Sequence, residues 1–293
     1  MTMIYQNIAI IGIGLIGASV ALKARREKLV GTITCYDASE TVRREAKELA
    51  IGDVIAETID ACVAEADLVI LAVPVGAMQE VIKQIAPHLK AGAVITDTGS
   101  TKRSVIRDVG PHVPESCIFI PSHPMAGTEF SGPAAGFPSL FESRYWLLVP
   151  EGAPATQTDI LARFFQGLGA ITEEMEAGYH DKVVALTSHL PHLIAYTIVG
   201  TAVDLEADLK DDVIRFSASG FRDFTRLAAS DPTMWRDVSL NNDEAVLEML
   251  QRFTEDLSYL QRGIRWHEGD KLFDLFARTR AIRKSVIDAG QDS

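Results

Sequence analysis

The sequence predicts an α/β fold, with a doubly wound and mostly parallel sheet in the first part and an all-helical domain after it. Two observations lead to this prediction. Short apolar runs alternate with helix-spaced segments through the first part, whereas almost every segment from Ala177 onward has helical spacing. We therefore expect two domains, over residues 1–175 and residues 176–293.

The apolar runs of the first part are short, continuous and separated by segments long enough to form helices. Such runs are typical of parallel strands whose two faces are both covered by helices. The expected strands are residues 7–12, 32–36, 68–73, 93–97 and 117–121. The expected helices between them are residues 15–27, 39–49, 76–85 and 101–109.

The second part contains signals for breaks and for one long helix. Breaks are expected at Pro191, residues 204–211, Asp231-Pro232 and Gly269. The segment Asn241-Asn242-Asp243 predicts a helix start, after which apolar residues recur in steps of four and three and form one stripe. The stripe is Val246, Leu250, Phe253, Leu257, Leu260 and Ile264. It packs either within its own domain or against a second copy of the chain.

The composition excludes some partners and favours a cytoplasmic protein. The chain of 293 residues has a formal net charge of −12, whereas nucleic acids and anionic membranes are bound by basic surfaces. We expect neither partner, and no apolar run approaches the roughly 20 residues of a membrane-spanning helix. Cys35, Cys62 and Cys117 form no CxxC pair, which is typical of thiols in a reducing compartment.

A glycine motif joins the first expected strand to the first expected helix. Gly12, Gly14 and Gly17 match GxGxxG, and Leu15 and Ile16 begin the helix. The three glycines permit a tight turn, the approach of a pyrophosphate to the backbone, and close packing of the helix on the sheet. The helix dipole also favours an anion there. The motif therefore predicts a Rossmann-type dinucleotide-binding domain over residues 1–175.

Asp37 ends the second expected strand. Its carboxylate would accept hydrogen bonds from the adenosine ribose and repel a 2′-phosphate, which favours NAD over NADP. Arg43 and Arg44 lie close in sequence and keep NADP possible.

Further cofactor contacts are expected where the later strands end. Ligands bind at the carboxyl ends of the strands in open α/β sheets. Val73 and Pro74 end the third expected strand, and Thr98 follows the fourth. Thr98 or Ser100 could also cap the following helix.

Two histidine-containing segments suggest a catalytic or binding site. His123 directly follows an expected strand and could accept a proton from a substrate hydroxyl near neutral pH, although a structural histidine is the alternative. His189 and His192 are three residues apart. Contact with a small molecule is favoured for this pair over a structural role, and a metal site ranks last because no third ligand has suitable spacing.

A third polar segment carries Arg222 and Arg226, which are four residues apart and would face the same way on a helix. A guanidinium matches a carboxylate through two parallel hydrogen bonds, so the pair could clamp a substrate carboxylate. The alternative is that both arginines are exposed and balance the negative charges of Asp223 and Asp231.

Together these segments resemble the prephenate/arogenate (cyclohexadienyl) dehydrogenase family. The resemblance covers nearly the whole chain and rests on five motifs in order: GIGLIG, DTGSTK, SHPMAGTE, SHLPH and FRDFTR with its SDPTMW continuation. It implies oxidative decarboxylation of prephenate or arogenate with hydride transfer to NAD(P), yielding 4-hydroxyphenylpyruvate or tyrosine. It also implies that the helical domain forms a homodimer.

The resemblance further implies roles for single residues, and no metal is expected, because the histidine pair has no third ligand. His123 would accept the proton of the ring hydroxyl, and Ser100 would orient both that hydroxyl and His123. Arg226 would hold a substrate carboxylate. The other residues expected in the substrate pocket are His192, His189, Glu129 and Trp235, with Glu129 in gating or polar positioning.

Two other functions stay open on the sequence alone. A β-hydroxyacid dehydrogenase also joins a Rossmann domain to a helical domain, but that family has asparagine four residues after a lysine, whereas Leu186 follows Lys182 here. A non-catalytic NAD-binding redox sensor would not need His123, the paired histidines and Arg226 together. Prephenate and arogenate both stay open as the substrate.

Overall fold

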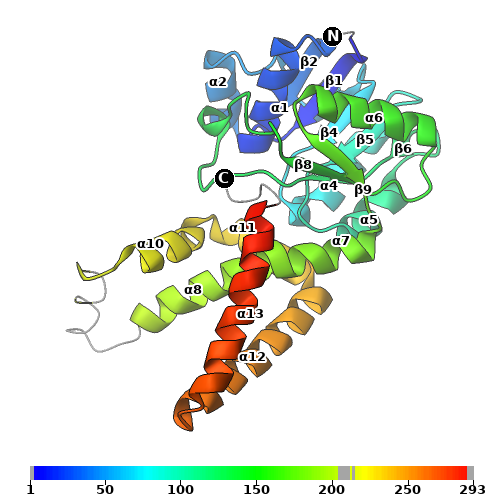
Figure 1. Cartoon of the computed structure of the whole chain (residues 1–293). Helices are drawn as coiled ribbons and strands as arrows, with labels where there is room; N and C mark the ends of the chain where they lie inside the picture. Colours follow the sequence, from blue (N-terminus) through cyan, green and yellow to red (C-terminus); the bar gives the residue numbers. More distant parts are fainter. Residues whose placement is uncertain (1–2, 204–211, 213–214, 289–293) are drawn as a thin grey trace. The chain divides into compact units, whose positions relative to one another are not determined.

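The computed structural model describes residues 3–203, 212 and 215–288 (Figure 1). The break expected over residues 204–211 lies outside this described part. The chain divides into two compact units, Met1–Ala245 and Val246–Ser293. The first unit contains both sheets and every residue that the sequence analysis assigned to a site.

The main sheet has six parallel strands in the order β3-β2-β1-β4-β5-β6. The strands are β1 (Tyr5–Ile11), β2 (Val30–Tyr36), β3 (Val54–Ile55), β4 (Leu68–Leu71), β5 (Val94–Asp97) and β6 (Ile118–Phe119). This order confirms the expected doubly wound sheet. From β1 the sheet extends through β2 and β3 on one side and through β4, β5 and β6 on the other, and such sheets bind ligands at this switch point between β1 and β4. The two-residue strand β3 was not expected, because it is too short to give a pattern.

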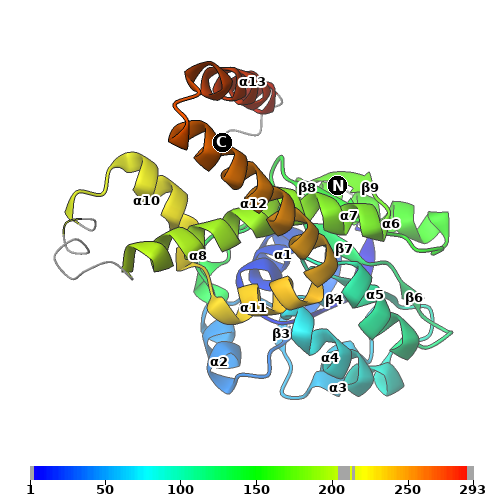
Figure 2. The same cartoon turned by 90° about the horizontal axis from the view of Figure 1, so that it is seen from below.

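Alternate side chains of β1 show that helices cover both faces of the sheet. Ile8 and Ile10 are buried with residues of α1, α2 and α6, whereas Ala9 and Ile11 are buried with residues of α3, α4 and α5. Figure 2 shows α3, α4 and α5 grouped together. The helices are α1 (Leu15–Arg26), α2 (Glu40–Glu48), α3 (Ile59–Val63), α4 (Met78–Ile85), α5 (Arg103–Val109) and α6 (Ala155–Gly167).

A second, three-stranded sheet was not expected from the sequence. Its strands are β7 (Ser122–Pro124), β8 (Tyr145–Leu148) and β9 (Ile171–Glu174), with β7 antiparallel and β9 parallel to β8. Trp146 is fully buried in it, stacks on Phe165 with ring centroids 3.8 Å apart, and donates its indole N–H to Ser122. His123 consequently lies within a strand, not just beyond one as the sequence suggested.

The expected helix break at Pro191 is wrong. The helix α7 (Ala177–Val184) passes through a π-helical turn, η5 (Ala185–His189), directly into α8 (Leu190–Val203). The Leu190 N–H donates to the Ala185 carbonyl, five residues back, as in a π-helix. The regular helical hydrogen-bond pattern is therefore already interrupted next to Pro191, which has no N–H to donate. The helix therefore continues through the proline.

The combined helix Ala177–Ala202 also corrects the expectation about apolar length. Its 26 residues are long and apolar enough to cross a membrane by length and composition, a property shared with core helices of proteins that cross none. Buried polar side chains at His180, Asp181 and His189 interrupt its apolar character.

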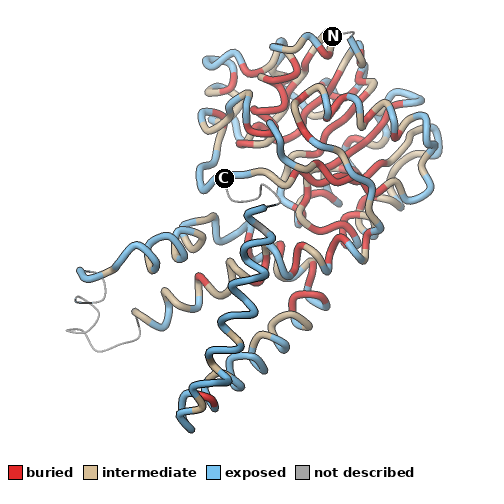
Figure 3. The backbone as a smooth tube through the Cα atoms, viewed as in Figure 1, coloured by how far each residue is buried: buried red, intermediate tan, exposed pale blue. Residues whose placement is uncertain are grey.

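The remaining helices confirm three of the expected boundaries, and the first is the helix start at Asn241-Asn242-Asp243, because α12 begins at Asp243. Asp231 caps α11 by accepting a hydrogen bond from the Met234 N–H at 2.9 Å, and Gly269 begins α13. These helices are α10 (Ser219–Thr225), α11 (Pro232–Asn241), α12 (Asp243–Arg265) and α13 (Gly269–Asp288). The tube in Figure 3 is coloured as exposed along most of α13.

Candidate active site

The turn after β1 is shaped for close approach by a ligand. Gly12 has a φ of +97°, and a Cβ there would lie 2.3 Å from the Ala72 carbonyl oxygen. A Cβ at Gly17 would lie 2.0 Å from the Gly12 carbonyl oxygen, so only glycine allows this helix to pack so closely. The Cβ position of Gly14, in contrast, has no atom within 4 Å. The first turn of α1 (Leu15, Ile16 and Gly17) carries no acidic side chain, which suits an anionic pyrophosphate.

The Asp37 carboxylate is held beside this turn by two backbone N–H groups. It accepts hydrogen bonds from Ile13 at 3.0 Å and from Ser39 at 2.9 Å. Arg43 donates to the backbone carbonyl of Asp37 at 2.7 Å, and its guanidinium lies 5.5 Å from the centroid of the Tyr36 ring. The carboxylate is therefore oriented before any ligand binds.

The loop after β4 meets the glycine turn, and the loop after β5 meets the end of β4. The Thr98 N–H donates to the Leu71 carbonyl at 3.1 Å, and the Cβ position of Gly12 lies 3.1 Å from the Val73 side chain. Pro74 follows directly and precedes a short helical turn. The structure thus gathers the expected cofactor residues at the carboxyl edge of the sheet, and their shape and open glycine turn fit a dinucleotide.

A buried ion pair lies beneath this edge. Lys102 donates to the Asp97 carboxylate and, at 2.6 Å, to the Ser122 carbonyl, while the Ser122 N–H donates to Asp97 at 3.0 Å. Burial lowers the pKa of Lys102, and the charges of Asp97 and Asp181 oppose that shift. Buried charges persist only when they are paired and hydrogen-bonded. The pair therefore ties the start of β7 to the end of β5.

His123 contacts a histidine that the sequence analysis did not single out. The Nδ1 atom of His123 lies 2.9 Å from Nε2 of His180, and Nδ1 of His180 lies 2.8 Å from a carboxylate oxygen of Asp181. Asp181 also accepts hydrogen bonds from the N–H groups of Lys102 at 2.7 Å and Arg103 at 2.9 Å. Figure 2 shows β7 and α7, the elements that carry the two histidines, side by side.

Burial and neighbouring charges set the protonation of this chain of contacts. Burial lowers the pKa of His123 well below its usual value, and the charges of His180, Lys102 and His189 lower it further. Burial likewise lowers the pKa of His180, against the effect of its bond to Asp181. Burial acts to raise the pKa of Asp181, but its hydrogen bonds outweigh this and the pKa is lowered. Neutral histidines beside an ionised aspartate result at neutral pH.

His189 lies at the end of the π-helical turn and is fully buried. The Asn242 amide nitrogen is 3.2 Å from Nδ1 of His189 and donates to the Asp181 carbonyl at 2.8 Å. Burial lowers the pKa of His189 to about 4, and the backbone of Ser100 lies close enough to oppose that shift. Ser100 is therefore adjacent to the histidines, on the loop after β5.

The other expected pocket residues form two contacts. The His192 ring stacks on the Trp235 ring, with centroids 3.6 Å apart and planes 20° from parallel. Arg226 lies 3.5 Å from the carboxylate of Glu129. Burial lowers the pKa of His192, and the charge of Arg226 adds to this shift, so the two contacts are neighbours. Trp235 also meets His189 edge to face, at 5.9 Å between centroids.

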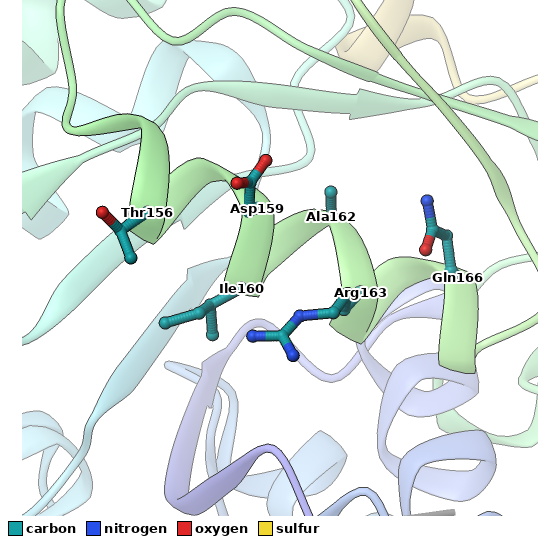
Figure 4. Close-up of a pocket in the computed structure, with 6 residues that line it drawn as sticks. All are labelled: Thr156, Asp159, Ile160, Ala162, Arg163 and Gln166. Atoms are coloured by element: carbon teal, nitrogen blue, oxygen red, sulfur yellow. The ribbon is translucent and has the colours of Figure 1, made fainter.

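An open depression of 410 Å³ lies elsewhere, along α6 (Figure 4). Figure 4 shows its six lining residues, all on that one helix: Thr156, Asp159, Ile160, Ala162, Arg163 and Gln166. It contains none of the residues described above and is not the candidate site.

Two family models match the chain. The prephenate dehydrogenase nucleotide-binding domain matches residues 20–174, and the prephenate dehydrogenase dimerization domain matches residues 176–278. The chain belongs to the prephenate dehydrogenase family. This membership overturns the β-hydroxyacid dehydrogenase alternative.

Relatives of this prephenate dehydrogenase family member match it over nearly its full length. A cyclohexadienyl dehydrogenase of Zymomonas mobilis is 42% identical over 97% of both chains. A prephenate dehydrogenase of Bacillus subtilis is 32% identical over 98% of this chain and 77% of its own. The crystal structure of prephenate dehydrogenase from A. aeolicus, in complex with hydroxyphenyl propionate and NAD+, has a TM-score of 0.89 at 30% identity, covering 98% of this chain and 99% of that one.

Sequence reasoning missed four polar residues of this prephenate dehydrogenase site. Asp97 and Lys102 are the first and last residues of the DTGSTK segment, but nothing in the sequence showed that both are buried. His180 and Asp181 stand in no recognised motif, and His180 meets His123 from 57 positions away. A histidine–aspartate pair on an otherwise apolar helix was the available signal.

Proposed function

We propose that this chain catalyses the oxidative decarboxylation of prephenate and/or arogenate, with transfer of hydride to NAD, giving 4-hydroxyphenylpyruvate or tyrosine. The observation that carries the proposal is the buried, neutral His123 in β7, directly after Ser122, whose N–H bonds to Asp97 at the carboxyl end of β5. The names of the relatives with 42% and 32% identity support it.

In this proposal His123 handles the proton of the reaction. The ring hydroxyl of the substrate gives its proton to His123 as hydride leaves the same carbon and the carboxylate departs as carbon dioxide. A bound nicotinamide supplies the hydride acceptor. A neutral imidazole is needed for the proton transfer, and the lowered pKa of His123 keeps it neutral. Ser100 orients the hydroxyl and the histidines from the loop after β5.

Substrate binding is assigned to the neighbouring contacts. Arg226 holds a substrate carboxylate by charge-assisted hydrogen bonds, in exchange for its present contact with Glu129. Glu129 positions the arginine when the pocket is empty. His192 and Trp235 form a stacked aromatic wall, and His189 supports it edge to face.

We propose NAD over NADP as the preferred cofactor. The Asp37 carboxylate is oriented by two backbone N–H groups and is therefore ready to bind ribose hydroxyls. A 2′-phosphate would meet that negative charge, and Arg43 is engaged with the Asp37 carbonyl. Gly12, Gly14, Gly17, Val73, Pro74 and Thr98 complete the proposed cofactor contacts.

We propose that the chain works as a homodimer through its helical domain. Large apolar side chains remain exposed along α12 and α13 in the single chain: Leu257 (50%), Ile264 (58%), Phe273 (71%) and Phe276 (52%). Apolar surfaces of this extent mark protein interaction sites. The matched dimerization-domain description supports the same assignment. The proposal includes a division of the chain into a cofactor domain at residues 1–175 and a substrate and dimer domain at residues 176–293. It also includes a cytoplasmic location, which suits the free thiols of Cys35, Cys62 and Cys117.

The test is NADH or NADPH formation by the purified chain with prephenate and with arogenate, each offered NAD and NADP. Turnover with either substrate is expected, with NAD preferred, and the better pair identifies the substrate. Measurable NAD binding without turnover in any combination would contradict the proposal and favour a redox sensor.

A further inference from the structure

Three consecutive contacts link His123 to the start of α5. His123 touches His180, His180 touches Asp181, and Asp181 accepts the N–H groups of Lys102 and Arg103. His180 is fully buried, while Asp181 is 2% and His123 7% exposed, so water does not substitute for these contacts. Each proton in the chain must therefore be placed by the protein groups themselves.

The proton positions follow in one direction, starting from Asp181. Its lowered pKa keeps the carboxylate ionised, so it only accepts, and the proton in the 2.8 Å contact belongs to Nδ1 of His180. His180 is neutral and therefore presents a lone pair at Nε2. The proton in the 2.9 Å contact must then sit on Nδ1 of His123. Nε2 of His123 is left with its lone pair.

We propose that His180 and Asp181 are positioning residues, which fix His123 in the tautomer whose Nε2 accepts the substrate proton. The inference rests on the proposed function, because it assigns the atom that receives the hydroxyl proton. When Nε2 takes that proton, the new positive charge of His123 is stabilised through the neutral His180 by the Asp181 carboxylate. A histidine held in the other tautomer would have no lone pair toward the substrate.

Other charged groups that face His123 do not provide this selection. Lys102, just before α5, and His189, in the π-helical turn, act on the pKa of His123, and both disfavour its protonation. The Lys102 ammonium donates its hydrogen bonds to the Asp97 carboxylate and the Ser122 carbonyl. These groups keep His123 neutral, whereas the His180 contact distinguishes its two nitrogens.

The sharpest variant is Asp181→Asn. Asparagine removes the negative charge and leaves one oxygen for the three N–H groups that contact Asp181, those of Lys102, Arg103 and His180. The proton of His180 is then no longer held on Nδ1, and the tautomer of His123 is no longer fixed. We expect kcat to fall about 10²–10⁴-fold, as when a catalytic histidine loses its correct tautomer or its role as base. The KM and the NAD dissociation constant should change little, because neither ligand touches Asp181.

The tautomer itself is read by nitrogen NMR of the protein labelled at histidine ring nitrogens, with the His123 signals assigned by their loss in His123→Asn. The wild type should show a protonated Nδ1 and an unprotonated Nε2 on His123, and Asp181→Asn should show protonated Nε2 in part of the molecules. Asp67→Asn is the control, since Asp67, like Asp181, accepts a backbone N–H and a side-chain N–H, from Asn7 and from the Lys90 ammonium, but lies at the opposite end of β4. It should keep the wild-type tautomer and turnover.

A second pair of variants covers the case in which Asp181→Asn does not fold. His180→Gln keeps an oxygen that can accept the Nδ1 proton of His123, whereas His180→Leu keeps none. His180→Gln should retain the higher kcat. A protonated Nε2 on wild-type His123, or equal kcat in these two variants, would overturn the inference. The NMR result does not depend on turnover, so failure of the proposed function with both substrates is recognised separately.

Discussion

The imidazole of His192 stacks on the indole of Trp235 with ring centroids 3.6 Å apart. The contact joins α8 to α11, two helices that are 43 residues apart at these positions. It places a flat aromatic wall next to Arg226, whose charge acts on the pKa of His192. A ring-shaped substrate anchored by a carboxylate fits such a wall.

Removal of the indole should weaken substrate binding. A stacked aromatic contact contributes about 0.5–1.5 kcal/mol beyond the area it buries, so Trp235→Leu should raise the KM about two- to tenfold. Trp235→Phe keeps a ring in place and should raise it less. Steady-state kinetics with thermal unfolding as a control measures both. Equal KM values for the two variants would show that the stack does not contribute.

Loss of the arginine should affect KM more than kcat. Arg226→Ala removes a charge-assisted contact that holds the substrate before and during the reaction, worth about 1.5–3 kcal/mol. The KM should rise about 10- to 100-fold. Arg222→Ala, an exposed change four residues earlier, is the matched control and should have little effect. A similar rise in both variants would point to general charge attraction.

The cofactor preference should depend on the Asp37 charge. Asp37→Ser removes the repulsion of a 2′-phosphate, so the KM for NADP should fall strongly and the KM for NAD should rise. Kinetics with each cofactor at saturating substrate measures this. Unchanged NADP kinetics would assign the preference to another residue, with Arg43 the next to test.

Stability should decline when the pH falls through the range in which unfolded histidines titrate. The pKa of His189 is about 4 in the folded chain against 6.5 when unfolded, so its contribution is complete above pH 6.5 and is lost as the pH falls toward 4. One such group lowers the free energy of unfolding by about 2 kcal/mol between pH 7 and pH 5. His123 and His180, whose pKa values are also lowered, act in the same direction.

Urea unfolding at pH 7 and pH 5 measures this loss. His189→Asn should show a smaller difference between the two pH values than the wild type. The same difference in both proteins would mean that His189 is not held neutral by burial.

Much of the fold could be predicted from the sequence, because the apolar strands and the glycine turn act locally. The parallel sheet follows from apolar strands that alternate with helices, except for the two-residue β3, and the Gly12 turn requires its own residue type. The β7-β8-β9 sheet was missed because Trp146 and its neighbours gave no alternating pattern distinct from a loop. The helix break expected at Pro191 was wrong, because the π-helical turn before the proline allows the helix to continue.

The candidate site was predicted in its motifs but not in its connections. His123, His189, His192 and Trp235 each contact another residue of the candidate site. The His123–His180 contact could not be predicted, because it depends on how α7 packs against β7. Asn242 was expected only as a helix start, yet its amide bridges Asp181 and His189.

The most direct test of the central claim is the effect of His123→Asn on turnover and on NAD binding, measured in the same preparation. The account predicts that kcat with prephenate or arogenate falls about 10²–10⁴-fold while the NAD dissociation constant is kept. It also predicts that wild-type kcat/KM stays level through pH 6.5 and declines only at lower pH, as the lowered pKa of His123 is reached. Normal turnover by His123→Asn would contradict the account.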